Sequence, residues 1–81
     1  MDSAEILTRL SEIAAEHFDL PGLTLTRQST AGDVPGWDSL AHIQFLMQVE
    51  RALKVRFKSS EVSGFADVGQ LMDRIHARLG G

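Results

Sequence analysis

Three stretches of this 81-residue chain place apolar residues at helical spacing, and an aspartate stands at the start of each. Aspartate is a favoured N-cap residue, because its carboxylate accepts a hydrogen bond from a free N–H group in the first helical turn. Asp2, with Ser3 as the alternative, caps the first stretch, while Asp38 and Asp67 cap the others. The pattern predicts helices over residues 3–18, over residues 39–55, and from residue 67 to the glycine pair at 80–81.

Each of these helices has one apolar face that should form the core. The expected core residues are Ile6, Leu10, Ile13, Ala14 and Phe18 on the first helix, Phe45, Leu46, Val49, Ala52 and Leu53 on the second, and Val68, Leu71, Met72, Ile75 and Leu79 on the last.

The remaining segments are short or irregular. Residues 59–63 fit a short third helix, capped by Ser59 or Ser60, with Val62 pointing inward and Gly64 at its end. Residues 19–36 alternate like a strand at one point, but a lone strand has nothing to pair with, so we expect one long ordered loop. The predicted fold class is all-α: a four-helix bundle with a long loop between helices 1 and 2, in a single domain covering residues 1–81.

Composition and charge exclude several classes of function. The chain has no cysteine, which rules out disulfides, zinc–thiolate sites and a side-chain thiol nucleophile. His17, His42 and His76 are scattered without metal-ligand spacing, so we expect no metal site. A net charge of -3 argues against nucleic acid as the main partner. The chain has no signal-like run and no span for a bilayer, so we expect a soluble, cytoplasmic monomer without membrane insertion.

The segment Gly36-Trp37-Asp38-Ser39-Leu40 carries the one candidate for chemistry. Asp38 is the cap, so Ser39 falls in the first turn of the second helix, exposed beside the loop. The free N–H groups and the partial positive charge at that helix end favour an anionic substituent. A phosphodiester on the Ser39 hydroxyl would be well placed there.

The second helix has an additional apolar stripe outside its core face. Leu40, Ile43 and Met47 fall together on the helical wheel, on a side shared with polar residues. They either pack under a loop or another helix, or form a docking surface that leads away from Ser39. Both explanations fit the periodicity.

An enzyme is not expected. Asp38, Ser39 and His42 are the side-chain types of a hydrolase triad, but they lie within a single helical turn. Nothing evident supplies an oxyanion hole or a substrate pocket. We therefore assign no catalytic residue.

Asp38-Ser39-Leu40, followed by Ile43, Phe45-Leu46-Met47, Val49 and Glu50, resembles the phosphopantetheine attachment motif and second helix of acyl carrier proteins. The resemblance extends over nearly the whole chain, since these proteins are four-helix domains of this length. It implies that a phosphopantetheinyl transferase attaches 4'-phosphopantetheine covalently to Ser39. The thiol of this cofactor would then hold an acyl or aminoacyl group as a thioester.

The resemblance also implies roles for the neighbouring residues. Asp38 would help to seat the transferase and its metal-bound coenzyme A. For Trp37, the position before the cap itself predicts a contact with His42 that fixes how the loop enters the helix. The alternative is that Trp37 lines the path of the prosthetic arm or contacts its phosphate. The positions that match the docking surface of the family are Leu40, Ile43, Gln44, Met47, Glu50 and Arg51.

The charges of this helix depart from the familiar pattern of fatty-acid carriers, which are strongly acidic here. Of Gln44, Glu50 and Arg51, only Glu50 keeps a negative charge. Lys54, Arg56 and Lys58 follow, either as a solvated face or as a determinant of partner choice. The departure favours a specialised pathway of polyketide or extender-unit, aminoacyl or D-alanyl type over housekeeping fatty-acid synthesis.

The expected partners follow from the resemblance: the transferase, a loading ligase or acyltransferase, and a downstream synthase or transferase. Positions matching Phe57, Val62 and Phe65 border the acyl cavity of the family, and two phenylalanines there would favour a short or polar cargo. The alternative is a small helical interaction domain that is never modified. It would keep the surface of Leu40, Ile43 and Met47 and have no need of Ser39.

Overall fold

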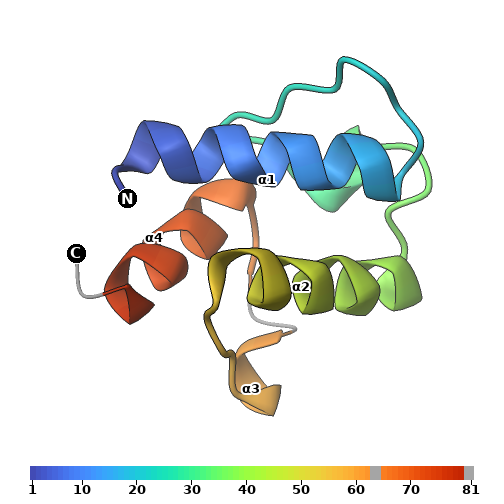
Figure 1. Ribbon diagram of the computed structural model, residues 1–81. Coiled ribbons are helices and arrows are strands. Elements are labelled where there is room, and N and C mark those ends of the chain that lie inside the picture. Colours follow the sequence, from blue (N-terminus) through green and yellow to red (C-terminus); the bar gives the residue numbers. More distant parts are fainter. Residues whose placement is uncertain (63–64, 80–81) are drawn as a thin grey trace.

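A computed structural model describes residues 1–62 and 65–79 of the chain. In these ranges it contains α1 (Ser3–His17), α2 (Ser39–Leu53), the short α3 (Ser59–Val62) and α4 (Val68–Arg78), with a single 3-10 turn, η1 (Ala31–Asp33), in the long loop. α1 packs against both α2 and α4, and α3 lies below α2 in the view of Figure 1. The predicted all-α fold with a short third helix is confirmed. The predicted ends at Gly64 and at Gly80-Gly81 lie outside the described residues.

The three predicted aspartate caps are present. The carboxylate of Asp2 accepts a hydrogen bond from the N–H group of Glu5 at 2.8 Å, and Asp38 accepts one from Ala41 at the same distance. Asp67 accepts one from Gln70 at 2.9 Å. Each long helix therefore begins directly after an aspartate whose carboxylate accepts a hydrogen bond from an N–H group of the first turn.

The predicted serine cap of α3 is wrong. The helix begins at Ser59, so neither Ser59 nor Ser60 precedes it. The carboxylate of Glu61 instead reaches back and accepts a hydrogen bond from the N–H group of Lys58 at 2.8 Å. A glutamate in the first turn thus satisfies the donor in front of the helix.

The core lies between the three long helices and the loop. Its buried apolar residues are Ile6, Leu10, Ala14, Leu25, Val34, Phe45, Leu46, Val49, Leu53, Val55, Val68, Leu71, Met72 and Ile75. Ile13, Phe18 and Val62 are partly buried against this cluster. The long loop contributes two of its residues, so it is part of the core rather than a cover over it.

Two expected core residues are exposed. Ala52 faces a shallow surface hollow that it shares with long polar side chains of α1 and α2, such as Arg9 and Gln48, and its methyl group does not reach the core. Leu79 follows the last turn of α4 as its C-cap residue and is 38% exposed. Conversely, Ser11 is buried, and its hydroxyl accepts a hydrogen bond from the N–H group of Leu25 at 2.9 Å.

The long loop also caps α4. The carbonyl groups of Arg27 and Ser29 accept hydrogen bonds from Gly69 and Val68, each at 2.9 Å. These are the first two N–H groups of α4, which have no partner within the helix. A Cβ atom on Gly69 would lie 3.0 Å from the Arg27 carbonyl oxygen, so this close approach favours glycine.

Candidate functional site

Ser39 is the first residue of α2 and is exposed. The loop turns into the helix at Gly36, whose φ of +86° favours glycine. Asp38 then takes an extended conformation as the N-cap residue. The sequence signals of turn, cap and helix start are all used as predicted, and they leave the Ser39 hydroxyl at the open end of the helix.

Two backbone N–H groups remain available beside this hydroxyl. Asp38 accepts from Ala41 through its carboxylate and from His42 through its carbonyl group, at 2.8 and 2.9 Å. The N–H groups of Ser39 and Leu40 have no acceptor among residues 1–62 and 65–79. Because first-turn N–H groups point beyond the helix end, they create a small region of positive potential there.

Trp37 and His42 form a hydrogen-bonded aromatic pair next to Ser39. The indole Nε1–H group of Trp37 donates to His42 Nδ1 at 2.9 Å, and the two rings stack with centroids 5.9 Å apart. His42 Nε2 lies 2.8 Å from the carbonyl oxygen of Val62 on α3. Since an indole N–H group only donates, His42 must accept at Nδ1 and donate from Nε2, as a neutral imidazole.

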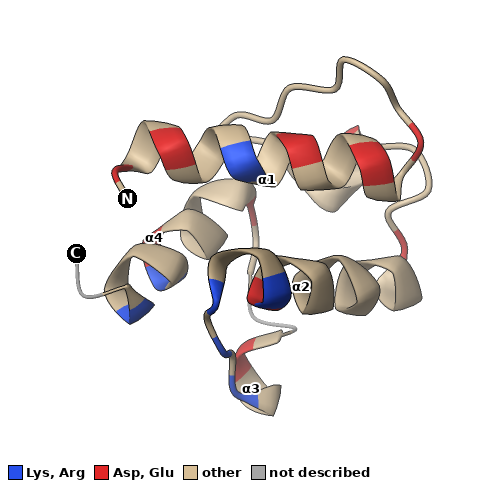
Figure 2. Ribbon diagram, viewed as in Figure 1, with Lys and Arg blue, Asp and Glu red and all other residues tan. Residues whose placement is uncertain are grey.

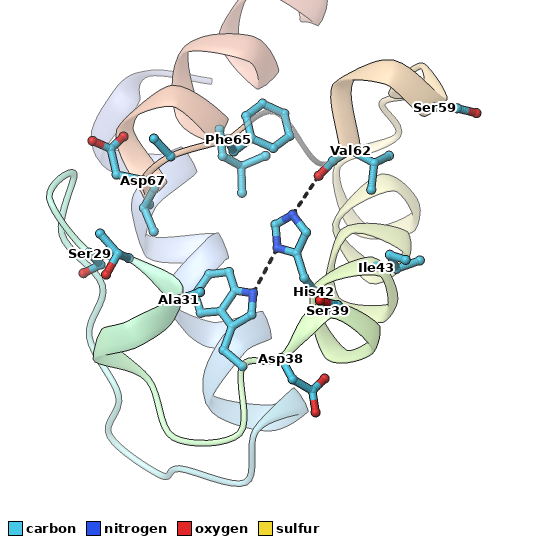
Figure 3. A pocket seen from close by; sticks show the side chains of 15 residues that line it. Ser29, Ala31, Asp38, Ser39, His42, Ile43, Ser59, Val62, Phe65 and Asp67 are labelled. Atoms are coloured by element: carbon cyan, nitrogen blue, oxygen red, sulfur yellow. Dashed lines mark hydrogen bonds between the residues drawn. The ribbon is translucent and has the colours of Figure 1, made fainter.

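This pair connects three parts of the fold. Trp37 belongs to the loop, His42 to α2 and Val62 to α3, and Figure 3 draws the two dashed hydrogen bonds that join them. Trp37 also packs against Phe18 and Phe45, with centroids 5.3 and 5.2 Å away. The predicted contact between Trp37 and His42 is present.

A groove of about 670 Å³ opens beside Ser39, between the loop, α2, α3 and α4. Its lining includes Trp37, Ser39, His42, Val62 and Phe65. In the view of Figure 3, Val62 and Phe65 lie above Ser39 and His42. Of the three residues expected at its border, Val62 and Phe65 line the groove, but Phe57 does not. Phe57 packs edge-to-face against Phe65, with ring centroids 5.8 Å apart.

The apolar stripe of α2 is exposed. Leu40 is 65% exposed, Ile43 47% and Met47 48%. No loop or helix within the described ranges covers them, so the explanation that they pack under another element is wrong for this part of the chain. Their polar neighbours Gln44 and Arg51 are exposed as well.

Glu50 has an internal role in addition to its place beside the stripe. Its carboxylate accepts a hydrogen bond from the N–H group of Phe57 at 2.9 Å, and the residue is half-buried. Glu50 thus holds the segment that follows α2. A contact seven residues along the chain and beyond a helix end has no periodic signature, so sequence reasoning did not find it.

His17 joins α1 to α2 close to the site, which sequence reasoning also missed. Its Nε2 atom lies 3.2 Å from the carbonyl oxygen of Ala41, and its Nδ1 atom lies 2.8 Å from the amide nitrogen of Gln48. The only sequence signal for this role was the position of His17 in the last turn of the first helix. The described residues contain no cluster of three or more potential metal ligands.

The match to a solved structure decides the family. The chain superposes on the solution structure of a holo acyl carrier protein from Geobacter metallireducens with a TM-score of 0.84. The two sequences are 32% identical, and the match covers 93% of this chain and 86% of that one. The chain belongs to the acyl carrier protein family.

A curated sequence agrees with this assignment. An acyl carrier protein of Saccharopolyspora erythraea is 27% identical over 73 residues, which are 90% of this chain and 77% of that protein. No family model matches the chain. Acyl carrier proteins are carriers without catalytic activity, so the grouping of Asp38, Ser39 and His42 is not a triad. No described helix of this acyl carrier protein is long and apolar enough to cross a membrane.

Proposed function

We propose that residues 1–81 form one carrier domain that holds an acyl or aminoacyl group on a 4'-phosphopantetheine arm attached to Ser39. The observation that carries this proposal is the exposed Ser39 hydroxyl at the start of α2, beside two N–H groups without an acceptor among the described residues. When attached, the cofactor supplies a flexible arm whose terminal thiol forms a thioester with the cargo.

The residues around Ser39 fit this group. The N–H groups of Ser39 and Leu40 can donate to an anionic phosphodiester on the Ser39 oxygen. Asp38 uses one carboxylate oxygen, Oδ1, for its cap, and no described residue donates a hydrogen bond to the other. That oxygen is available to the metal-bound coenzyme A of a phosphopantetheinyl transferase, which is the role proposed for Asp38.

Carriage depends on tethering and weak docking. A flexible arm raises the concentration of the cargo at the active site of a bound partner, without any additional contact. The exposed Leu40, Ile43 and Met47 stripe supports a docking role, with Gln44, Glu50 and Arg51 beside it. Methionine suits a surface that fits several partners.

We assign the protein to a specialised biosynthetic pathway of polyketide or extender-unit, aminoacyl or D-alanyl type. The support is the charge of α2, where Gln44 and Arg51 replace acidic residues and Glu50 is tied to the Phe57 backbone. Its partners are then the transferase, a loading ligase or acyltransferase, and a downstream synthase or transferase. Complementary charge selects among such partners more than it sets affinity.

The groove supports a short cargo that remains near the surface. Next to Ser39, the hydrogen bond from Trp37 to His42 joins the loop to α2, and that from His42 to Val62 joins α2 to α3. A long acyl chain would have to break them to reach the core. Methyl chemical shifts of loaded protein report directly on the depth of the cargo.

The intact mass of the protein tests the carrier proposal. After incubation with coenzyme A and a broad-specificity phosphopantetheinyl transferase, we expect a single phosphopantetheinyl increment, which Ser39→Ala abolishes without loss of folding. Leu46→Ala is the matched core variant: it should accept the increment but lose about 2–5 kcal/mol of unfolding free energy.

Three outcomes would each contradict part of this assignment. A folded wild-type sample without the increment favours the unmodified interaction domain. An increment that persists in Ser39→Ala places the attachment elsewhere. If Ser39→Ala unfolds the protein, the division between site and core is wrong.

A further inference from the structure

Four of the eight lysine and arginine side chains make no ion pair with another described residue, and all four lie within residues 51–58. These four are Arg51, Lys54, Arg56 and Lys58, and all are exposed. The other four pair with carboxylates: Arg9 with Glu12, Arg27 with Asp73, and Arg74 and Arg78 with Glu61. The positive charge not balanced by an ion pair is therefore concentrated at one end of α2.

Figure 2 shows how charge is distributed over the molecule. Acidic residues recur along α1, whereas basic residues gather at the end of α2 and in the segment leading to α3. Of the nearby carboxylates, Glu61 is occupied by Arg74 and Arg78, and Glu50 is bound to the backbone of Phe57. The end of α2 is thus a basic region on a chain whose net charge is -3.

This basic region is continuous with the exposed apolar stripe. A surface hollow of about 500 Å³ is lined by Met47, Glu50, Arg51, Lys54, Val55 and Arg56. Met47 is also the last residue of the stripe that begins with Leu40. At 1.5 Å per residue, the surface from Leu40 to Lys54 extends roughly 20 Å along α2.

We propose that this face docks a partner protein whose own surface presents acidic side chains around an apolar socket. The apolar stripe would enter the socket, and Arg51, Lys54 and Arg56 would meet the carboxylates. The inference deepens the proposed function, since docking along α2 would present the arm on Ser39 to the partner. A nucleic acid could also bind these cations through its phosphates, but phosphate binding gives no reason for an apolar side chain such as Met47, which is 48% exposed, to lie beside them.

A pair of charge-reversed peptides tests this inference. The first is an amphipathic helix with leucines on one face and flanking glutamates, and the second has lysine at each glutamate position. Each is titrated into ¹⁵N-labelled protein whose phosphopantetheinyl state is known from its mass. We expect the acidic peptide to shift amide resonances over residues 40–56 and to bind at least about tenfold more tightly than the basic one. Added salt should weaken this binding, because exposed charges are screened.

Charge reversal of the protein supplies the matched experiment. The triple variant Arg51→Glu, Lys54→Glu, Arg56→Glu should exchange the preference and bind the basic peptide more tightly. Arg9→Glu on α1 should leave the preference unchanged. Circular dichroism confirms that both variants are folded.

Several results would overturn the inference. The first two are equal binding of the two peptides and the absence of any amide shift with either peptide at millimolar concentration. The others are amide shifts that lie only outside residues 40–56, and tighter binding of a single-stranded DNA oligonucleotide than of the acidic peptide. The mass measurement is separate: if the folded protein takes up no phosphopantetheinyl increment from the transferase but still binds the peptides charge-selectively, the carrier proposal fails and the docking surface stands.

Discussion

Asp19 ends α1 in a backbone conformation that suits glycine better than aspartate. Its φ is 54°, in the left-handed region. Its N–H group donates to the carbonyl group of Glu16 at 3.3 Å, and that of Leu20 donates to Ala15 at 2.9 Å. This pair of hydrogen bonds closes the helix end and requires the left-handed residue between them.

Asp19→Gly should therefore stabilise the protein. Glycine adopts positive φ without a Cβ clash, and the change removes a negative charge from the unfavourable end of the helix dipole. We expect the free energy of unfolding to rise by about 0.5–1 kcal/mol after the greater freedom of glycine in the unfolded chain is included. Urea denaturation measures it.

Asp19→Asn is the control, because it removes only the charge. Asparagine tolerates the left-handed region about as well as aspartate does. If Asp19→Gly is no more stable than Asp19→Asn, the backbone argument fails and the charge accounts for the effect.

At the scale of single residues, prediction from sequence worked where the interaction is local. Asp2, Asp38 and Asp67 cap helices through contacts three residues along the chain, which a sequence displays directly. Ala52 was expected in the core but is exposed, and the burial of Ser11 was missed. The burial of both residues depends on which element lies opposite. Helical periodicity identifies a face but not how far the neighbouring helix covers it.

Between elements, the hydrogen-bonded connection of Trp37, His42 and Val62 decides what the groove can accept. It joins the loop, α2 and α3 at the point where cargo on Ser39 would enter. Its two hydrogen bonds are part-buried, so a chain that displaced them would leave polar groups without partners. The cargo prediction belongs to this scale.

Decanoyl-loaded protein should therefore resemble acetyl-loaded protein in its core. We expect the methyl resonances of Ile6, Leu10 and Ile75, which are fully buried, to differ little between the two forms. Trp37→Phe removes the indole donor and should allow the decanoyl chain to perturb them more strongly. Core shifts in the wild type as large as those in a fatty-acid carrier would contradict the short-cargo proposal.

The arrangement of elements was harder to predict than the elements themselves. The four helices follow from periodicity and caps, but the groove depends on how the loop and α3 are placed. Phe57 was expected at its border because it resembles a family position, yet its contact is with Phe65. Similarly, predicting the exposure of Leu40, Ile43 and Met47 would have required the positions of every neighbouring element.

Across the whole molecule, Glu61 connects the C-terminal elements. Its carboxylate binds Arg74 at 3.0 Å and also Arg78, both on α4, while it accepts the Lys58 N–H group in front of α3. The hydrogen bond from the Lys58 backbone is the main cause that holds the pKa of Glu61 below its ordinary value of 4.5, with Arg78 and Arg74 contributing further. The charged carboxylate is thus favoured in the folded state.

This depressed pKa has a definite sign for stability. A carboxyl group that releases its proton more readily when folded stabilises the folded state above its unfolded pKa, and the contribution is lost as pH falls through the folded pKa. The contribution of Glu61 should be complete above about pH 5.5 and should decline below pH 4.5, its ordinary pKa.

Glu61→Gln should therefore lower the midpoint of urea denaturation at pH 7, because the amide cannot attract the two arginines as a charge does. The difference from the wild type should be unchanged at pH 5.5 and should shrink at pH 3.5, where more of the wild-type carboxyl group is protonated. Glu12→Gln is the control, since its exposed partner Arg9 lies 3.6 Å away in the same helix and such pairs contribute little. A Glu61→Gln deficit of equal size at all three pH values would mean that packing or hydrogen bonding, rather than charge, makes Glu61 important for holding α3 against α4.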